Sequence, residues 1–347
     1  MAVAESNQTL GTGVASLQKK AQGQSLWLDA WKRLRRNKLA LIGAIIILLN
    51  IFVAIFAAQL APKPYDLQVL TDNNSAPAWV TKLFPNMVPK SEGGYVNINN
   101  SYILGADNVG RDLLSRIIYG SRVSLAVAFV GPFFSLLIGI TFGLISGYAG
   151  GKVDNFMMRF VDIVYAFPTL LLVILMMAFF RSGFAAATPG TFAYAVGQLD
   201  SSMGGMLFIF IGIGITSWMN LARLVRGQVL SVREKEYIEA ARSLGVSTRE
   251  IMFRHVLPNI LGPVIVSETL TIPTYISYEA FLSFIGLGVN PPLPSWGQMI
   301  SDGSRAISSY PNQAIFPAFA LFLVMFAFNF LGDGLRDALD PRMRGVD

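Results

Sequence analysis

The segment Ser231–Asn259, SVREKEYIEAARSLGVSTREIMFRHVLPN, is the longest strongly charged stretch in a very apolar chain. It contains two sequences with the spacing of a helix-capping box, SVRE from Ser231 and STRE from Ser247. Gly245 stands between them, where a helix commonly ends in a left-handed conformation, and Pro258 is expected to end the second helix. The pattern therefore predicts a helix, a tight turn and a second helix, with a long apolar run on each side.

The composition is typical of a membrane protein. Of 347 residues, 53% are hydrophobic and only 14% are charged, whereas soluble domains carry about 25% charged residues. The chain has no cysteine and a single histidine, His255, so a disulfide framework and Cys/His metal sites are excluded. A Ser-His-Asp hydrolase would have to use His255 inside the charged segment, which argues against that class.

Six apolar runs are each near the length that crosses a bilayer, about 20 residues. They cover 39–60, 123–146, 161–180, 206–221, 260–282 and 314–331. One such run could be a core helix of a large soluble protein, but six in one chain exclude that class. The first run follows basic residues, as in a secretory signal peptide, but it is too long and lacks a small-x-small cleavage site. The predicted fold class is therefore all-α, a polytopic membrane protein with about six transmembrane helices.

The positions of Lys and Arg set the predicted orientation. Both are dense before the first run and in the charged segment, whereas the loops after the third and fifth runs carry almost none, Arg181 and Arg305. We therefore expect both termini and the charged segment on the cytoplasmic side. The expected division is a cytoplasmic tail with an amphipathic helix that lies on membrane lipid (1–38), a first transmembrane helix (39–60), an extracytoplasmic loop (61–119), a transmembrane domain (120–337) that contains the coupling loop 231–258, and a cytoplasmic tail (338–347).

The charged segment resembles the EAA loop of ABC importer permeases. The residues that carry the resemblance are Glu239, Ala240, Ala241, Gly245, Leu257 and Pro258. His255 stands where the family usually has isoleucine, and the run RHVLPN around it is similar to the dipeptide/oligopeptide branch. The resemblance implies that this loop docks into a groove on a separate ATPase subunit. Small alanine side chains and a glycine turn suit close approach of another surface.

Three further motifs resemble the same branch. They are LGADNVGRDLLSR from Leu104, SFIGLGV from Ser283 with the following PP and SWG, and NFLGDGLRDALDPR from Asn329. The LGADNVGRDLLSR motif alone also reads as a short interfacial helix leading into the next span. Together the motifs extend the resemblance over nearly the whole chain from the first apolar run. It implies the type I importer permease fold, in a bacterial or archaeal inner membrane. It also implies a second permease subunit, two ATPase subunits and an extracytoplasmic substrate-binding protein as partners.

No phosphate-binding loop occurs in the chain. The nearest sequence, GGK at Gly150, has Ser146 in place of the earlier glycine and Val153 in place of the following Ser or Thr. The GDG sequence at Gly332 suggests an intramembrane aspartyl protease, but the preceding glycine of that motif is Phe330 here. The chain is therefore not expected to be an enzyme or to hold a cofactor, and ATP hydrolysis is expected on partner chains.

Three ionisable residues lie near membrane depth and are candidates for the transport path or a subunit interface: Asp162, Glu268 and Glu279. Asp162 alternatively forms a helix-end ion pair with Arg159, one turn away. Glu268 and Glu279 fall on nearly the same face of one helix. For Glu279 the alternative is a hydrated carboxylate at the membrane interface.

The function that the resemblance implies is ATP-driven, binding-protein-dependent import, most simply of dipeptides or oligopeptides. Nickel complexes and oligosaccharides are alternative substrates in the same family. An ion-coupled secondary transporter is a more distant alternative, and it predicts inverted repeats that the sequence does not display. LGVSTREI also resembles a DNA-binding helix-turn-helix, but such a motif needs its own soluble domain, and apolar runs begin at once on both sides. No nucleic-acid partner is therefore expected.

Overall fold

The computed structural model describes residues 26–340, so the polar N-terminal residues 1–25 and the last seven residues lie outside the described part. That part is built of helices and contains no β-strand, which confirms the predicted all-α class. In chain order the elements are α2 (Leu26–Leu34), α3 (Lys38–Ile55), α4 (Ala57–Leu60), η1 (Leu70–Asp72), α5 (Ala78–Leu83), η2 (Lys90–Glu92), α6 (Leu113–Phe134), η3 (Ser135–Gly139), α7 (Ile140–Ala149), α8 (Gly151–Tyr165), α9 (Thr169–Ala185), α10 (Phe192–Ser202), α11 (Met206–Arg233), α12 (Glu236–Ser243), α13 (Thr248–Glu250), η4 (Ile251–Val256), α14 (Leu257–Phe284), α15 (Trp296–Ser304) and α16 (Asn312–Leu339).

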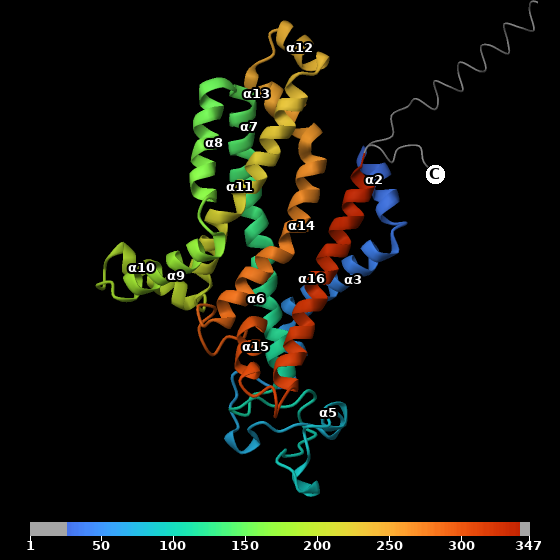
Figure 1. Cartoon of the computed structure of the whole chain (residues 1–347), viewed down its shortest axis with the longest axis vertical. Helices are drawn as coiled ribbons and strands as arrows, with labels where there is room; N and C mark the ends of the chain where they lie inside the picture. The colour runs from blue at the N-terminus through green and yellow to red at the C-terminus, as the bar shows by residue number, and fades with distance from the viewer. Residues whose placement is uncertain (1–25, 341–347) are drawn as a thin grey trace, which may run out of the picture.

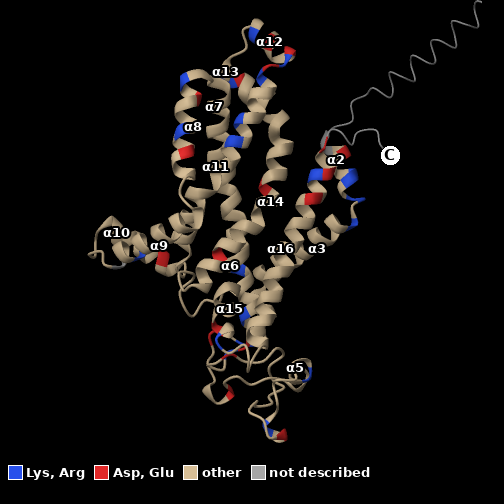
Figure 2. Cartoon of the chain, viewed as in Figure 1, with Lys and Arg blue, Asp and Glu red and all other residues tan. Residues whose placement is uncertain are grey.

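The long helices form an elongated bundle, with α12 at one end and the segment around α5 at the other (Figure 1). Within residues 26–340, five helices are long and apolar enough to cross a membrane, and α8 with α9 makes a sixth crossing if the bent pair is one span. Lys and Arg gather towards the end that carries α2, α8 and α12 (Figure 2). This agrees with the charge asymmetry read from the sequence.

The first transmembrane helix, α3, packs along α16, the last one. It begins at an Asn37 cap, whose Oδ1 accepts from the backbone N–H groups of Leu39 and Ala40 at 3.1 and 3.2 Å. Gly43 allows the close approach, because a Cβ there would lie 2.5 Å from the carbonyl oxygen of Ala327. Inside a membrane the hydrophobic effect does not drive helices together, and small residues such as glycine allow close packing instead.

The long predicted loop after the first span is largely irregular, but it has its own small core. Ala76, Val80, Met87 and Val96 are buried together in it. The loop is fixed to the start of α16, because Gln313 Nε2 donates to Asn74 Oδ1 at 2.8 Å and to the carbonyl of Ala106 at 3.2 Å. The segment is therefore an ordered unit attached to the helix bundle.

The second span starts earlier than the sequence indicates. The predicted run begins at residue 123, whereas α6 begins at Leu113, behind an Asp112 cap that accepts from the backbone N–H of Ser115 at 2.7 Å. The LGADNVGRDLLSR motif thus forms a loop that turns into α6, together with the first residues of α6. The turn is held by Asp107, which accepts from the backbone N–H groups of Val109 and Arg111. Five residues of π-helix, η3, separate α6 from α7.

The third span is not a straight helix. Residues 161–180 are predicted as one run, but α8 ends at Tyr165, α9 starts at Thr169, and the two axes differ by 77°. Pro168 explains the break, because it has no N–H to donate and disfavours helical geometry in the residue before it. The helices α9 and α10 consequently project to one side of the bundle (Figure 1).

The central helix α11 packs closely on α7 and η3 through a stripe of glycines. A Cβ at Gly143 would lie 2.6 Å from the Cβ of Val225, and a Cβ at Gly147 would lie 2.8 Å from that of Val229. Gly139 extends the stripe one turn back along the chain. The close contact between these helices therefore depends on the absence of side chains along one face.

Candidate functional site

The predicted loop at the charged segment is present as α12, a turn at Gly245 and α13, which lie at the tip of the bundle (Figure 1). Its start was predicted wrongly. Ser231 lies inside α11, which continues to Arg233, and α12 begins after Lys235 without a side-chain cap. A helix that has already formed supplies acceptors for the N–H groups around Ser231, so its hydroxyl has no capping role there.

The end of the segment also differs from the prediction. Pro258 does not end a helix, because it is the second residue of α14, which continues to Phe284. The π-helical residues of η4 stand directly before Pro258, so its missing N–H falls where the regular α-helical hydrogen bonding is already interrupted. The π-helical residues of η4 join α13 to α14 without a gap. The second short helix is therefore the beginning of the fifth long apolar helix.

The turn itself agrees with the prediction. Gly245 has φ +78°, in the left-handed region, and its N–H donates to the carbonyl of Arg242 at 3.0 Å. The N–H of Val246 donates to the carbonyl of Ala241 at 3.1 Å, which closes the end of α12. Ser247 then caps α13 by accepting from the N–H of Glu250 at 3.2 Å.

The segment has one packed face and one open face. Ile238 and Ala241 are buried against Ile251 and Val256, so Ala241 holds α12 in place. Glu239 and Ala240 are exposed, as are Gly245 and Pro258, whereas His255 and Leu257 are half-buried. Of the two alanines expected at a docking surface, Ala240 alone faces outward.

Large apolar side chains add to the open face, and the sequence analysis missed them. Leu244 is 83% exposed, Phe253 is 55% exposed and Tyr237 is 45% exposed. A hollow lined by Ser247, Arg249, Glu250 and Phe253 lies beside them. The sequence could have revealed them, because each is an isolated apolar residue inside a charged stretch and core packing does not account for it.

Ion pairs and backbone contacts fix the base of this segment. Arg226 of α11 donates to both carboxylate oxygens of Asp154 in α8 at 2.6 Å, and Ser146 of α7 donates to the same carboxylate. Arg233, at the end of α11, donates through Nη1 to the carbonyl oxygens of Gly147 and Tyr148 at 3.1 and 3.2 Å. The helix that leads into α12 is thereby joined to α7 and α8.

Asp162 forms an ion pair, but with a different partner from the predicted Arg159. Its Oδ1 lies 2.7 Å from Nη2 of Arg223 in α11, and both side chains are substantially exposed. The Arg223 guanidinium also lies 4.3 Å from the ring centroid of Tyr165. A role for Asp162 at the transport path stays a prediction.

Glu268 and Glu279 lie inside the packing of α14 on η3 and α6. Ser135 and Tyr275 each donate to the Glu268 carboxylate at 2.9 Å. Ser124 donates to Glu279 Oε2 at 3.1 Å. Because Glu279 is fully buried, it is not the hydrated interfacial carboxylate that the sequence left open. Both carboxylates are held by hydroxyl groups of this chain, and their placement at a path or subunit interface stays a prediction.

Family comparisons identify the chain. A profile described as "Binding-protein-dependent transport system inner membrane component" matches residues 139–345, and one described as "N-terminal TM domain of oligopeptide transport permease C" matches residues 25–77. The chain belongs to the family of binding-protein-dependent transport permeases. The resemblance read from the EAA-like loop and the three other motifs is therefore confirmed.

Several relatives of this permease match over nearly their whole length. It is 40% identical over 320 residues to the oligopeptide transport system permease protein OppC of Bacillus subtilis (strain 168), covering 92% of this chain and 91% of that one. It is 39% identical to OppC of Escherichia coli (strain K12), covering 94% of each chain. The dipeptide transport system permease protein DppC of B. subtilis is 38% identical, covering 91% of this permease and 86% of that chain.

Over about two thirds of its length this permease has the fold of a solved ABC transporter. The structure described as inward-facing conformations of the MetNI methionine ABC transporter superimposes with a TM-score of 0.52 at 20% sequence identity. The match covers 66% of this permease and 98% of that chain. At this identity the likeness establishes the fold, and the relatives above establish the family.

Proposed function

We propose that this permease imports dipeptides or oligopeptides, using ATP that separate ATPase subunits hydrolyse. The proposed coupling to the ATPase subunits rests on the open face of α12, which lies at the basic end of the bundle (Figure 2). A helix that projects from the bundle, is fixed at its base and exposes Leu244 suits docking into a groove of another protein. The names of the oligopeptide and dipeptide relatives support the substrate.

The proposed assembly contains this chain, a second homologous permease subunit, two ATPase subunits and an extracytoplasmic binding protein. The site proposed for the ATPase contact comprises Glu239, Ala240, Gly245 and the exposed part of 253–258, with Ala241 as an inward anchor. The charge distribution supports a cytoplasmic location for α12 and both termini. The ordered unit 61–112 then faces outward, towards the binding protein.

The proposed mechanism uses the contacts at the base of α12. ATP-driven closure of the ATPases moves α12, and the contacts of Arg226 and Arg233 carry that movement into α7, α8 and α11. The two permease subunits then alternate between inward-open and outward-open arrangements. This chain contributes no group to ATP hydrolysis in the proposal.

The test is uptake by the reconstituted assembly. Vesicles containing this chain, its partner permease, the ATPases and the binding protein should accumulate labelled alanyl-phenylalanine only when ATP is present. Labelled Ni²⁺ complexes and a labelled oligosaccharide are the matched alternatives. Accumulation of one of these instead of peptide contradicts the proposed substrate, and uptake without ATP contradicts the proposed coupling.

A further inference from the structure

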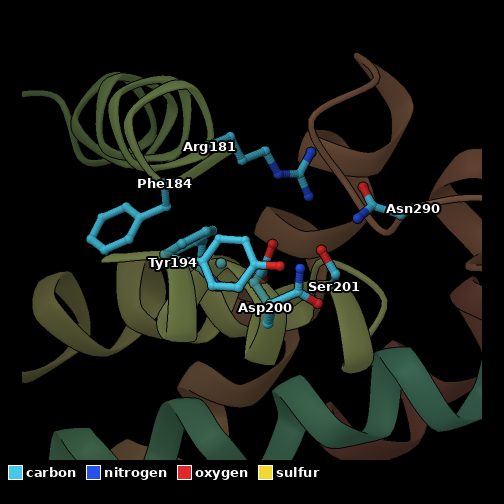
Figure 3. Close-up of a pocket in the computed structure, with 9 residues that line it drawn as sticks. Arg181, Phe184, Tyr194, Asp200, Ser201 and Asn290 are labelled. Atoms are coloured by element: carbon cyan, nitrogen blue, oxygen red, sulfur yellow. The ribbon is translucent and has the colours of Figure 1, made fainter. Parts of the chain in front are cut away.

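A polar cavity of about 350 Å³ lies between α9, α10 and the start of α11, and α12 takes no part in it (Figure 3). One end is charged and polar, with Arg181, Asp200, Ser201 and Asn290. The end away from Asn290 is aromatic, because Phe184 lies there and Tyr194 lies between Phe184 and Asp200 (Figure 3), and Phe208 also lines the cavity. The volume is near the lower end of the range for small-molecule pockets, about 300–1,000 Å³.

Arg181 lines the cavity with several N–H donors unused. Its Nη2 donates to the carbonyl oxygen of Gly205 at 3.2 Å and to that of Gly288. Its Nε is buried and has no hydrogen-bond partner in the described part of the chain. Its Nη1 also makes no hydrogen bond in that part and, unlike Nε, it is accessible, so Nη1 is the donor that an anion in the cavity can reach. The guanidinium is therefore held in position and has capacity left for an anion.

Asp200 supplies the opposite charge. It is 5% exposed, and its Oδ1 accepts a long hydrogen bond, 3.3 Å, from the backbone N–H of Phe208. Burial raises the pKa of the Asp200 carboxyl, while that N–H and the charge of Arg181 act in the other direction. Within residues 26–340 no ion pair joins Asp200 to Arg181. The cavity thus presents a cation and an anion that do not neutralise each other by direct contact.

The walls of the cavity are fixed by close backbone contacts. A Cβ at Gly197 in α10 would lie 2.9 Å from the carbonyl oxygen of Phe184 in α9. A Cβ at Gly205 would lie 2.8 Å from Arg181 Nη2. At the aromatic end, the rings of Phe180 and Phe208 stack with centroids 5.6 Å apart. Close packing of this kind limits the movement of the walls, which lowers the cost of binding a ligand.

We propose that this cavity binds a short peptide as a zwitterion, with the peptide carboxylate at Arg181, the peptide ammonium at Asp200 and an apolar side chain at the aromatic end. The proposal rests on the proposed peptide substrate and assigns it a binding site. Charge-assisted hydrogen bonds of both kinds are stronger than neutral ones, so the two ends set the orientation of the ligand. A zwitterionic lipid headgroup carries the same pair of charges, and the experiment separates the two sources.

The first measurement is binding of labelled alanyl-phenylalanine to the purified complex of this chain, its partner permease and the ATPases, without the binding protein. Asp200→Asn keeps an Oδ1 that accepts from Phe208, so it removes the charge and preserves the fold. We expect Asp200→Asn and Arg181→Gln to weaken binding by about tenfold or more, the equivalent of one charge-assisted hydrogen bond. Arg305→Gln is the matched control, because Arg305 is exposed and lies outside the cavity.

The second measurement uses N-acetyl-alanyl-phenylalanine, which has no ammonium group. The wild-type complex should prefer the free dipeptide by about tenfold, and Asp200→Asn should lose that preference. This comparison carries the test by itself if Arg181→Gln, which also removes a contact with Gly288, fails to assemble. Unchanged binding in Asp200→Asn together with an unchanged preference overturns the proposal.

The third measurement is the amount of phosphatidylethanolamine that co-purifies with each variant. If both substitutions abolish lipid retention while alanyl-phenylalanine binds at wild-type strength, the cavity holds a lipid headgroup and the peptide proposal is wrong. Wild-type vesicles that import no peptide would refute the proposed function. Vesicles that import peptide, with binding unaffected by both substitutions, refute only the assignment of the cavity.

Discussion

Arg226 of α11 binds Asp154 of α8 through two parallel hydrogen bonds, Nε to Oδ1 and Nη2 to Oδ2, each 2.6 Å long. Fork-to-fork pairing of this kind fixes both position and direction. The Asp154 side chain is 9% exposed and that of Arg226 is 34% exposed, so the pair is partly shielded from water. The contact therefore sets the angle between α8 and the helix that leads into α12.

Removal of this pair should destabilise the permease. Arg226→Met leaves the Asp154 carboxylate buried without its cation, and we expect a loss of about 1–3 kcal/mol, reduced from the value for a fully buried pair because Arg226 is partly exposed. Thermal unfolding of the purified assembly in detergent measures the change. Asp162→Asn is the matched control: its pair with Arg223 is exposed and should contribute only about 0–1 kcal/mol. Equal effects from the two substitutions would contradict the structural role of Asp154.

Substitution of Gly245 should uncouple transport from ATP. Its φ of +78° costs a side chain about 1–2 kcal/mol, and no atom lies within 4 Å of a Cβ built there. Gly245→Asp should therefore insert and pair normally but release the ATPases and lose uptake. Gly93→Asp has the same backbone cost and the same open surroundings at φ +81°, but it lies in the outer unit. Co-purification of the ATPases is the measurement, and full retention by Gly245→Asp would remove α12 from the coupling proposal.

Leu244 tests whether the apolar open face contributes to docking. It is 83% exposed, so Leu244→Ser should leave the stability of the permease almost unchanged. If an ATPase groove covers Leu244, the loss of about 1.5–3 kcal/mol of apolar burial should weaken ATPase binding by about tenfold or more. Leu70→Ser is the control, since Leu70 is 70% exposed in the outer unit. Equal ATPase affinity in both variants would place the contact elsewhere.

The orientation can be tested by cysteine labelling because the chain contains no cysteine. Ser243→Cys at the end of α12 should react with a membrane-impermeant maleimide only after the cytoplasmic side is opened. Ser91→Cys in η2 should react in intact cells, because Ser91 is exposed in the outer unit. Reaction of the Ser243 variant in intact cells would reverse the proposed topology.

Local signals in the sequence identified the family and the all-α membrane fold, but they placed the ends of helices poorly. A capping box at Ser231 is chemically sound, yet α11 continues through it, because packing of Val225 and Val229 on α7 extends the helix beyond the apolar run. Pro258 does not end the helix that runs from Thr248 to Phe284, because it follows the π-helical residues of η4, where the regular hydrogen bonding is already interrupted. At Pro168 a proline does interrupt the helix, and the third span bends.

The contacts of the candidate site depend on residues far apart in the chain. Glu268 is bonded to Ser135, 133 positions away, and Glu279 to Ser124, 155 positions away. Periodicity along one helix indicates which residues share a face, but it does not identify the helix opposite. The same limit applies to Arg226 and Asp154, whose pairing depends on the bend and packing of α8.

The glycine stripe on α7 has a mechanical consequence. With no side chains at Gly143 and Gly147, the backbone of α7 lies directly against Val225 and Val229 of α11. We therefore expect the two closely packed helices to move together. The stripe reaches back to Gly139 at the end of η3, one turn from Ser135 and its hydrogen bond to Glu268. A tilt of α11 would accordingly have to be shared by α7 and η3, and it would reach the Glu268 carboxylate through Ser135.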